Sequence, residues 1–164
     1  MQVYKFFCER LNLTIEFTEL SVSVLQKYRQ TFCRKESGGM LFCEALDDDV
    51  IRVSCVSEPD KKDIRSFFFF KHNDRAAQSK IDFFHQQGLH YVGDWHTHPQ
   101  LVPTPSQQDI DSIKSIYNNS KHHLQYMILL IVSSDISFGS SYLIFTDGRS
   151  IFPCSFVVEN DMVS

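Results

Sequence analysis

The segment GDWHTHP at residues 93–99 organises the sequence, and the segment PSQQD at residues 105–109 follows it closely. In an extended strand, His96 and His98 are two residues apart and therefore leave the same face of the backbone. Pro99 ends that strand, because proline has no N–H to donate to a neighbouring strand. The first segment therefore predicts a strand that carries two imidazoles near its end.

The second segment predicts the start of a helix. Thr104 before a proline is typical of an N-cap with proline at the first helical position. Ser106 and Asp109 are then three residues apart on one face of that helix. A strand that ends in His-x-His and a helix that begins with Ser-x-x-Asp can meet on one ion across a short loop. The pattern predicts a mononuclear metal site formed by His96, His98 and Asp109.

The ligand types favour zinc. Two imidazoles and one carboxylate leave a fourth tetrahedral position for water, which is typical of catalytic rather than structural zinc sites. A structural site needs four protein ligands, most often cysteines, and the sequence has no C-x-x-C pair. The five cysteines have no metal-binding spacing: Cys8, Cys33, Cys43, Cys55 and Cys154.

Each part of this pattern also has a purely structural interpretation. His-x-His is common, and Ser106 with Asp109 forms a capping-box-like pattern in which Ser106 is the N-cap. A competing box from Thr104 to Gln107 would leave Ser106 free for another role. Asp109 aligns with two isoleucines of the helix's apolar stripe, where an unpaired carboxylate is unfavourable. A metal ion or a buried arginine would offset that cost.

The same residues resemble the JAMM motif of the JAB/MPN-domain metalloproteases. The segment HTHP at residues 96–99, followed by Ser106 and Asp109, matches the metal-binding part of that motif. The family's remaining catalytic residue is a glutamate well upstream, and Glu36 in ESGG at residues 36–39 matches it. The sequence is most similar to the bacterial JAB proteases of type II CBASS anti-phage operons.

The resemblance implies an α/β fold: a single MPN (JAB)-type domain over residues 1–164, with its motif core at residues 36–133 and a cytidine-deaminase-like architecture. It implies one Zn2+ with a catalytic water, held by His96, His98 and Asp109. Glu36 would act as the general base and then as the acid, and Ser106 would donate to the oxyanion. The implied reaction is hydrolysis of a peptide or isopeptide bond.

The implied substrate is a protein joined through a flexible C-terminal tail, as in a ubiquitin-like conjugate of a cGAS-like nucleotidyltransferase. Trimming of a ubiquitin-like or sulfur-carrier precursor is the alternative peptidase role. A non-catalytic MPN scaffold is a further alternative, although a scaffold has no need of all five motif residues. A zinc deaminase would carry H-x-E and P-C-x-x-C, and neither pattern is present. Glu44 is a rival general base, but no glycines adjoin it.

Composition narrows the remaining functions. The length of 164 residues suits one domain with its own core. A net charge of −4 predicts no basic patch for nucleic acid. The sequence contains no run of 18 apolar residues, so no membrane span is predicted. The N-terminus lacks the pattern of an export signal. Five unpatterned cysteines favour a reducing, cytoplasmic location.

Periodicity and turn signals predict a mixed or mostly antiparallel sheet flanked by about three helices. The predicted strands cover residues 11–17, 40–46, 50–56, 67–70, 89–95, 124–132, 142–145 and 149–156. Helices are predicted over 18–30 with Thr18 as cap, from Asn73 or Asp74 to Gly88, and after Pro105. The four phenylalanines at 67–70 are predicted to be a buried strand, with an exposed partner-binding patch as the alternative. An acidic turn at 47–49 is predicted to be solvated.

Overall fold

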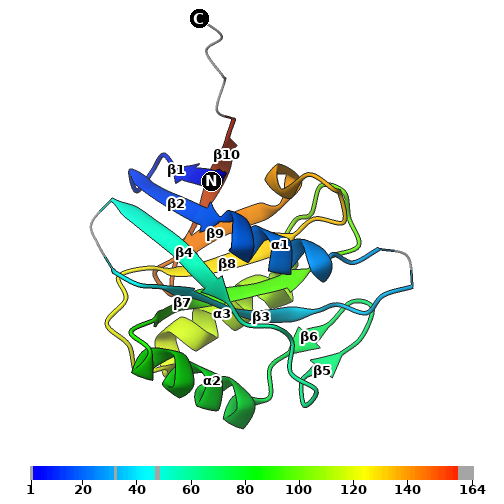
Figure 1. Ribbon diagram of the computed structural model, residues 1–164, viewed down its shortest axis with the longest axis horizontal. Coiled ribbons are helices and arrows are strands. Elements are labelled where there is room, and N and C mark those ends of the chain that lie inside the picture. The colour runs from blue at the N-terminus through cyan, green and yellow to red at the C-terminus, as the bar shows by residue number, and fades with distance from the viewer. Residues whose placement is uncertain (1, 32, 47–48, 159–164) are drawn as a thin grey trace, which may run out of the picture.

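A computed structural model gives the architecture and describes residues 2–31, 33–46 and 49–158 (Figure 1). Eight strands form one closed sheet in the order β1-β10-β9-β8-β7-β3-β4-β2, and β2 pairs again with β1. These strands are β1 Val3–Cys8, β2 Leu13–Thr18, β3 Gly38–Cys43, β4 Val50–Val56, β7 His90–Thr97, β8 Met127–Val132, β9 Tyr142–Thr146 and β10 Ile151–Val157. A separate two-stranded ribbon pairs β5 Ile64–Arg65 with β6 Phe70–Lys71.

The sheet is mixed and mostly antiparallel, as predicted. Only β2 with β4 and β7 with β8 pair in parallel within the closed sheet. Its closure into a barrel was not predicted, because β1 was not recognised as a strand. The segment VYKFFC at residues 3–8 lacks a clear alternation of apolar and polar residues. It becomes a strand by pairing with β2, which follows it directly, and with β10, which lies near the opposite end of the chain.

Three α-helices within the described residues flank the sheet: α1 Glu19–Lys27, α2 Asp74–Gln86 and α3 Gln107–Asn119. The predicted cap of α1 is confirmed, because Thr18 Oγ1 accepts the backbone N–H of Ser21 at 3.2 Å. Asn73 caps α2 in the same way, and Gly88 follows its end with a φ of +80°. In Figure 1, α1 lies in front of the barrel and α2 lies below β7 and β3, where Phe84 of α2 contacts Phe42 of β3.

Strand β8 is buried on both faces and separates two hydrophobic clusters. Alternate residues of β8 join the barrel interior with the buried face of α1: Ile128, Leu130 and Val132 with Val22 and Leu25. The other residues of β8 pack outside the barrel beneath α3: Met127, Leu129 and Ile131 with Ile110 and Ile113. Each fully buried side chain of this size stabilises the fold by about 1.5–3 kcal/mol. Strand β8 is therefore a rigid neighbour for β7, to which it is hydrogen-bonded.

Two predictions about local structure were wrong. Of the four phenylalanines at 67–70, only Phe70 lies in a strand, while Phe67 is 46% and Phe68 83% exposed. The ribbon that carries them is not part of the closed sheet. The helix after the motif begins at Gln107 with Ser106 as N-cap, so Thr104 is not the cap.

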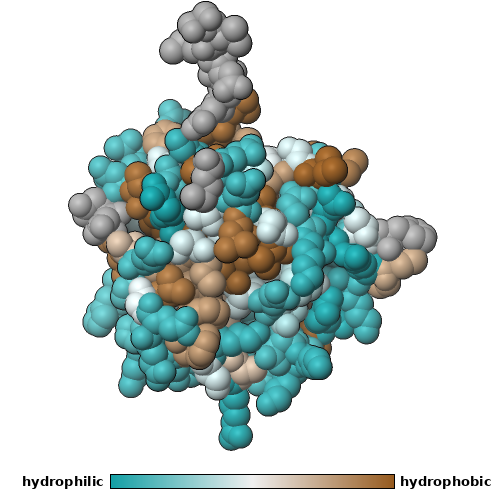
Figure 2. Space-filling view, in the orientation of Figure 1, coloured by the Kyte–Doolittle hydropathy of each residue, from teal (hydrophilic) through white to brown (hydrophobic). Residues whose placement is uncertain are grey.

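Other predicted features lie outside the described residues or remain predictions. The acidic turn at 47–49 falls largely outside them, as does the tail after residue 158. None of the described helices is long and apolar enough to cross a membrane. The cytidine-deaminase-like architecture stays a prediction. Figure 2 shows that one face of the molecule mixes hydrophilic side chains with an apolar patch near its middle.

Candidate metal centre

Pairing between β3 and β7 brings Glu36 to the two histidines. The strands are antiparallel, and Gly38 is the partner of His96. Continuing the same register by two residues places Glu36 opposite His98, although the two are far apart in sequence. The carboxylate oxygen Oε1 of Glu36 lies 3.8 Å from Nε2 of His98. The rival base, Glu44, is exposed just beyond the other end of β3, where Cys43 pairs with His90.

The two glycines after Glu36 allow this close approach. A Cβ atom on Gly38 would lie 2.4 Å from the ring of Phe70. A Cβ atom on Gly39 would lie 2.5 Å from the indole nitrogen of Trp95 and would also overlap a backbone oxygen. Only a residue without a side chain fits at either position. The glycines therefore let the segment with Glu36 enter the sheet against two aromatic side chains.

The N-terminus of α3 supplies the carboxylate. Ser106 Oγ accepts the backbone N–H of Asp109 at 3.1 Å, and Asp109 Oδ2 accepts the backbone N–H of Ser106 at 2.8 Å. This reciprocal capping box satisfies two N–H groups at the helix end, which explains why the helix begins here rather than after Thr104. The cap and the metal-site interpretations are compatible, because the capped carboxylate still faces both histidines.

The candidate ligand atoms of three side chains lie close together. Nε2 of His96 and Nε2 of His98 are 3.2 Å apart. Each lies 3.3 Å from a carboxylate oxygen of Asp109, Oδ1 for His96 and Oδ2 for His98. A tetrahedral zinc ion with bond lengths of about 2.0–2.1 Å holds its ligand atoms about 3.3–3.4 Å apart. The spacing of the donors therefore fits a tetrahedral ion of zinc's size.

The chemistry of the donors also fits a cation. When neutral imidazoles carry their proton on Nδ1, both Nε2 atoms are hydrogen-bond acceptors, as is the carboxylate. Acceptors that face one another repel unless a proton or a metal ion lies between them. Among the described residues, these three form the one group of His, Cys, Asp or Glu side chains able to hold a metal. The motif therefore yields a candidate mononuclear metal centre.

Burial and charge set the protonation of the surrounding groups. Glu36 is 4% exposed, and burial raises its pKa to about 7, while the charge of His98 lowers it and that of Asp109 raises it. Burial alone would raise the pKa of Asp109, but hydrogen bonds from both histidines outweigh it and hold that pKa well below its usual range. Burial alone would lower the pKa of His98, but Asp109 and Glu36 raise it above its ordinary value. Asp109 is thus an anion, which is the form that a carboxylate needs in order to bind a metal ion.

Ser106 lies at the exposed edge of the centre. Its hydroxyl oxygen accepts one hydrogen bond from the helix, which leaves its own hydrogen available to donate. A serine at this position therefore both caps α3 and offers a donor beside Asp109. These two uses do not compete for the same atoms.

A network of buried polar groups around Glu36 was not predicted from the sequence. Thr97 Oγ1 accepts the backbone N–H of Ser37 at 3.0 Å, and the Thr97 N–H donates to the Ser37 carbonyl at 2.9 Å. Arg65 donates from Nε to the Glu36 carbonyl oxygen at 2.6 Å and from Nη2 to Ser37 Oγ at 2.7 Å. Thr97 has a sequence signal, since it lies between the two histidines. No sequence signal marks Arg65, whose role depends on a long-range contact.

The remaining histidines, predicted to be surface or packing residues, lie outside the centre. His122 bonds with the carbonyl of Tyr117 at 2.7 Å. His72 faces Asp94 at 3.6 Å and Asp63 at 4.0 Å, so it forms a second histidine–carboxylate cluster.

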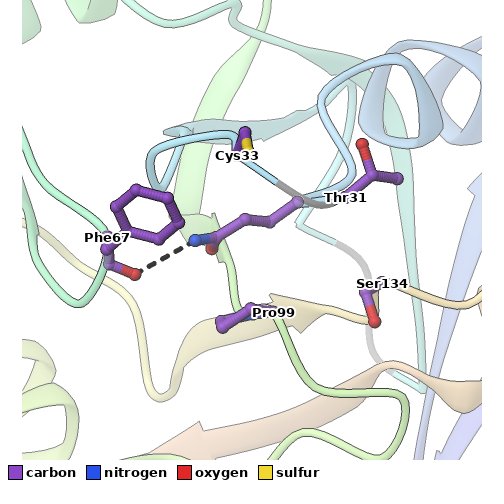
Figure 3. Close-up of a pocket in the computed structure, with 6 residues that line it drawn as sticks. Thr31, Cys33, Phe67, Pro99 and Ser134 are labelled. Carbon is purple, nitrogen blue, oxygen red and sulfur yellow. Dashed lines mark hydrogen bonds between the residues drawn. The ribbon is translucent and has the colours of Figure 1, made fainter.

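A cavity of about 400 Å³ lies beyond Pro99, the residue that follows the second histidine. Figure 3 shows Phe67 and Cys33 on one side of it and Pro99 and Ser134 on another. The side chain of Gln30 lines it and donates to the carbonyl oxygen of Phe67 at 3.0 Å (Figure 3). The exposed ring of Phe67 thus contributes to a hollow next to the strand end that carries the two candidate histidines.

Comparisons with known proteins agree with this picture. The chain is 36% identical over 92 residues to a CD-NTase/cGAS isopeptidase of Escherichia coli (strain TW11681), covering 54% of this chain and 58% of that protein. A protein of the same description from Vibrio cholerae is 36% identical over the same length and shares. A third, from Enterobacter hormaechei, is 28% identical over 102 residues, covering 61% of this chain and 56% of the relative. The chain therefore matches little more than half the length of these relatives.

A solved structure resembles the whole fold. The solution structure of protein DSY2949 from Desulfitobacterium hafniense superposes with a TM-score of 0.61 at 17% identity, covering 90% of this chain and 94% of that one. At this identity the likeness concerns the fold alone.

Fold and site together define an α/β barrel protein with a candidate mononuclear metal centre between strand β7 and helix α3. The family model described as prokaryotic homologs of the JAB domain matches residues 22–147. The chain belongs to that family, as its JAMM-like residues indicated.

Proposed function

We propose that this protein is a zinc-dependent isopeptidase that hydrolyses the amide bond after the C-terminal tail of a conjugated protein. The observation that carries the proposal is the convergence of a buried glutamate with three metal-ligand side chains at one strand end. A carboxylate beside a metal centre is the arrangement that a hydrolytic general base requires. The relatives described as isopeptidases support the same reaction class.

His96, His98 and Asp109 would hold the zinc ion. When bound, zinc supplies Lewis-acid chemistry, since it polarises a carbonyl group and makes water more acidic. A dication also favours the charged form of Glu36, so that this carboxylate is a base although burial alone raises its pKa. The rigid pairing of β7 with β8 keeps the two imidazoles in place.

The chain's own groups would move the protons. Glu36 takes a proton from the attacking water while the water oxygen bonds to the carbonyl carbon of the substrate. The Ser106 hydroxyl donates to the resulting oxyanion. When the C–N bond breaks, Glu36 passes that proton to the leaving amine. A carboxyl product and a free amine result, with no covalent acyl-enzyme. The five cysteines therefore need not act as nucleophiles.

The substrate we propose is a ubiquitin-like conjugate of a cGAS-like nucleotidyltransferase, in anti-phage defence of the CBASS type. The support is the description of three relatives as CD-NTase/cGAS isopeptidases together with the JAMM-like residues.

The test begins with zinc content. Elemental analysis of protein purified without added metal is expected to give about one zinc per chain, as for an open catalytic site. The protein should then cleave a nucleotidyltransferase joined by an amide bond to the tail of a ubiquitin-like protein, and a chelator should stop cleavage. Cleavage is followed by gel shift and by mass determination of both products.

The outcomes separate the alternatives. Absence of zinc, even after dialysis against it, would contradict the metal site and favour a scaffold. Bound zinc with cleavage of a precursor extension but not of the conjugate would instead indicate the processing peptidase.

A further inference from the structure

The β5–β6 ribbon contacts the segment with Glu36 at several points. Figure 1 shows the ribbon beside the chain as it enters β3. The backbone N–H of Glu36 donates to the carbonyl oxygen of Ser66 at 2.8 Å. Arg65, at the end of β5, bonds both the Glu36 carbonyl oxygen and the Ser37 hydroxyl. Both backbone polar groups of Glu36 therefore bond to the ribbon rather than to a neighbouring strand of the barrel.

The contact by Arg65 suits a guanidinium and no other side chain. Its planar fork presents two N–H donors at fixed separation, and here they reach a carbonyl and a hydroxyl on adjacent residues. Within the described part of the chain, no carboxylate forms an ion pair with Arg65. The charged donors therefore act on two neutral acceptors, the Glu36 carbonyl oxygen and the Ser37 hydroxyl, and such charge-assisted bonds are stronger than neutral ones.

The side chain of Glu36 has little else to hold it. Its carboxylate makes no hydrogen bond among the described residues and approaches only His98, at 3.8 Å. Its position is thus set by its backbone, which precedes the first residue of β3. Displacement of a catalytic group by about 1 Å is enough to reduce a rate by about 10²-fold.

We propose that Arg65 is a positioning residue, which holds Glu36 at the metal centre by bonding the Glu36 carbonyl oxygen and the Ser37 hydroxyl from the β5–β6 ribbon. The inference rests on the proposed function, because it assigns Arg65 to the reaction in which Glu36 is the base. Among the described residues, the hydrogen bonds of the Arg65 side chain go to Glu36 and Ser37 and not to His96, His98 or Asp109. Its effect on the reaction passes through Glu36.

The experiment compares Arg65→Ala and Arg65→Lys with Arg52→Ala. Arg52 is a matched control, because it also donates from Nε and Nη2, at 2.9 and 2.8 Å, but to Glu16 on the barrel surface. Arg65→Ala should lower kcat on the conjugate by roughly 10- to 100-fold, as loss of a supporting hydrogen-bond partner does. KM and zinc per chain should stay within about twofold. The kcat of Arg65→Lys should lie between those of the wild type and Arg65→Ala, since one ammonium cannot satisfy both acceptors.

A second readout is independent of activity. Hydrogen exchange at the Glu36 and Ser37 amides should quicken by at least about tenfold in Arg65→Ala, because local opening becomes easier. It should not change in Arg52→Ala. Thermal melting of each variant tests whether the chain is folded. If Arg65→Ala does not fold, Arg65→Lys takes its place in both measurements.

Four outcomes would contradict the positioning role of Arg65 or the function on which it rests. Unchanged exchange, or quickened exchange with unchanged kcat, would overturn the positioning role. A fall in zinc content parallel to the fall in kcat would also overturn it, because Arg65 would then support the metal site instead. If the wild-type protein cleaves no conjugate, the proposed function fails, and with it the catalytic part of this inference. Exchange then still decides whether Arg65 holds residues 36 and 37.

Discussion

Strand β7 carries two histidine–carboxylate clusters that lie two residues apart but differ in kind. At the end of the strand, the Nε2 atoms of His96 and His98 lie 3.2 Å apart, and each lies 3.3 Å from a carboxylate oxygen of Asp109. Two residues earlier, Asp94 faces His72 at 3.6 Å and accepts the hydroxyl of Tyr91 at 2.9 Å.

The second cluster satisfies its own polar groups. Asp63 accepts the backbone N–H groups of Asp60 and Asn73, and it lies 4.0 Å from His72. Burial lowers the pKa of His72, but the charges and hydrogen bond of Asp94 and Asp63 raise it overall. The two carboxylates therefore favour the charged form of the His72 imidazole. The two clusters therefore differ in geometry: candidate ligand atoms of three side chains lie close together in the first, whereas the carboxylates of the second accept hydrogen bonds from Tyr91 and from backbone N–H groups.

Removal of Asp109 is the strongest test of this comparison. Asp109→Ala should reduce zinc from about one per chain to near zero and abolish cleavage, because two imidazoles alone bind the ion weakly. Asp109→Asn should act similarly while it keeps an oxygen for the Ser106 N–H in the capping box. Elemental analysis of zinc is the measurement. Asp111→Ala, on the exposed side of α3, is the control, and unchanged zinc in either Asp109 variant would contradict the ligand assignment.

Removal of the base should separate metal binding from chemistry. Glu36→Ala and Glu36→Gln should keep about one zinc per chain, whereas kcat falls by about 10²- to 10⁴-fold because no group accepts the proton. Steady-state cleavage and elemental analysis on the same preparation check this. Glu44→Gln alters the exposed rival glutamate and should behave like wild type. Turnover by Glu36→Gln equal to wild type would remove Glu36 from the mechanism.

Ser106 should show both of its uses. Ser106→Ala is expected to lower kcat by about 10²- to 10³-fold through loss of an oxyanion donor. It should also destabilise the fold by about 1 kcal/mol through loss of the helix cap. Ser106→Thr keeps the hydroxyl and the cap, so it should retain more activity and more stability than Ser106→Ala. If the alanine variant loses stability but no activity, Ser106 is a cap only.

The smallest effect is expected at the second cluster. His72→Ala removes the imidazole that faces two partly buried carboxylates, which should lower the free energy of unfolding by about 1–3 kcal/mol. Melting temperature should fall by roughly 3–10 °C, while zinc content stays unchanged. His123→Ala alters an exposed histidine and is the control. Loss of zinc in His72→Ala would indicate that the two clusters act as one site and would contradict the distinction between them.

Much of the architecture was predictable because local signals marked it. Apolar residues and turn chemistry indicated β3, β4, β7, β8 and the β9–β10 hairpin, and Thr18 and Asn73 are caps where their sequence context predicted them. The prediction failed where tertiary contacts decided the outcome. Strand β1 closes the barrel only because β2 and β10 flank it. Phe67 and Phe68 are exposed because their ribbon stands apart from the sheet.

The sequence by itself determined the chemistry of the candidate centre. It contained two histidines at strand spacing, an acid in the first turn of a helix and a glutamate before two glycines, and these residue types define the donors. Only the tertiary structure decided their geometry, because the β3–β7 register sets the distance between Glu36 and His98. It also decided the contact with Arg65, since a hydrogen bond between residues 29 positions apart leaves no periodic trace in a sequence. Local spacing specifies which groups are available, whereas the pairing of distant strands specifies which of them meet.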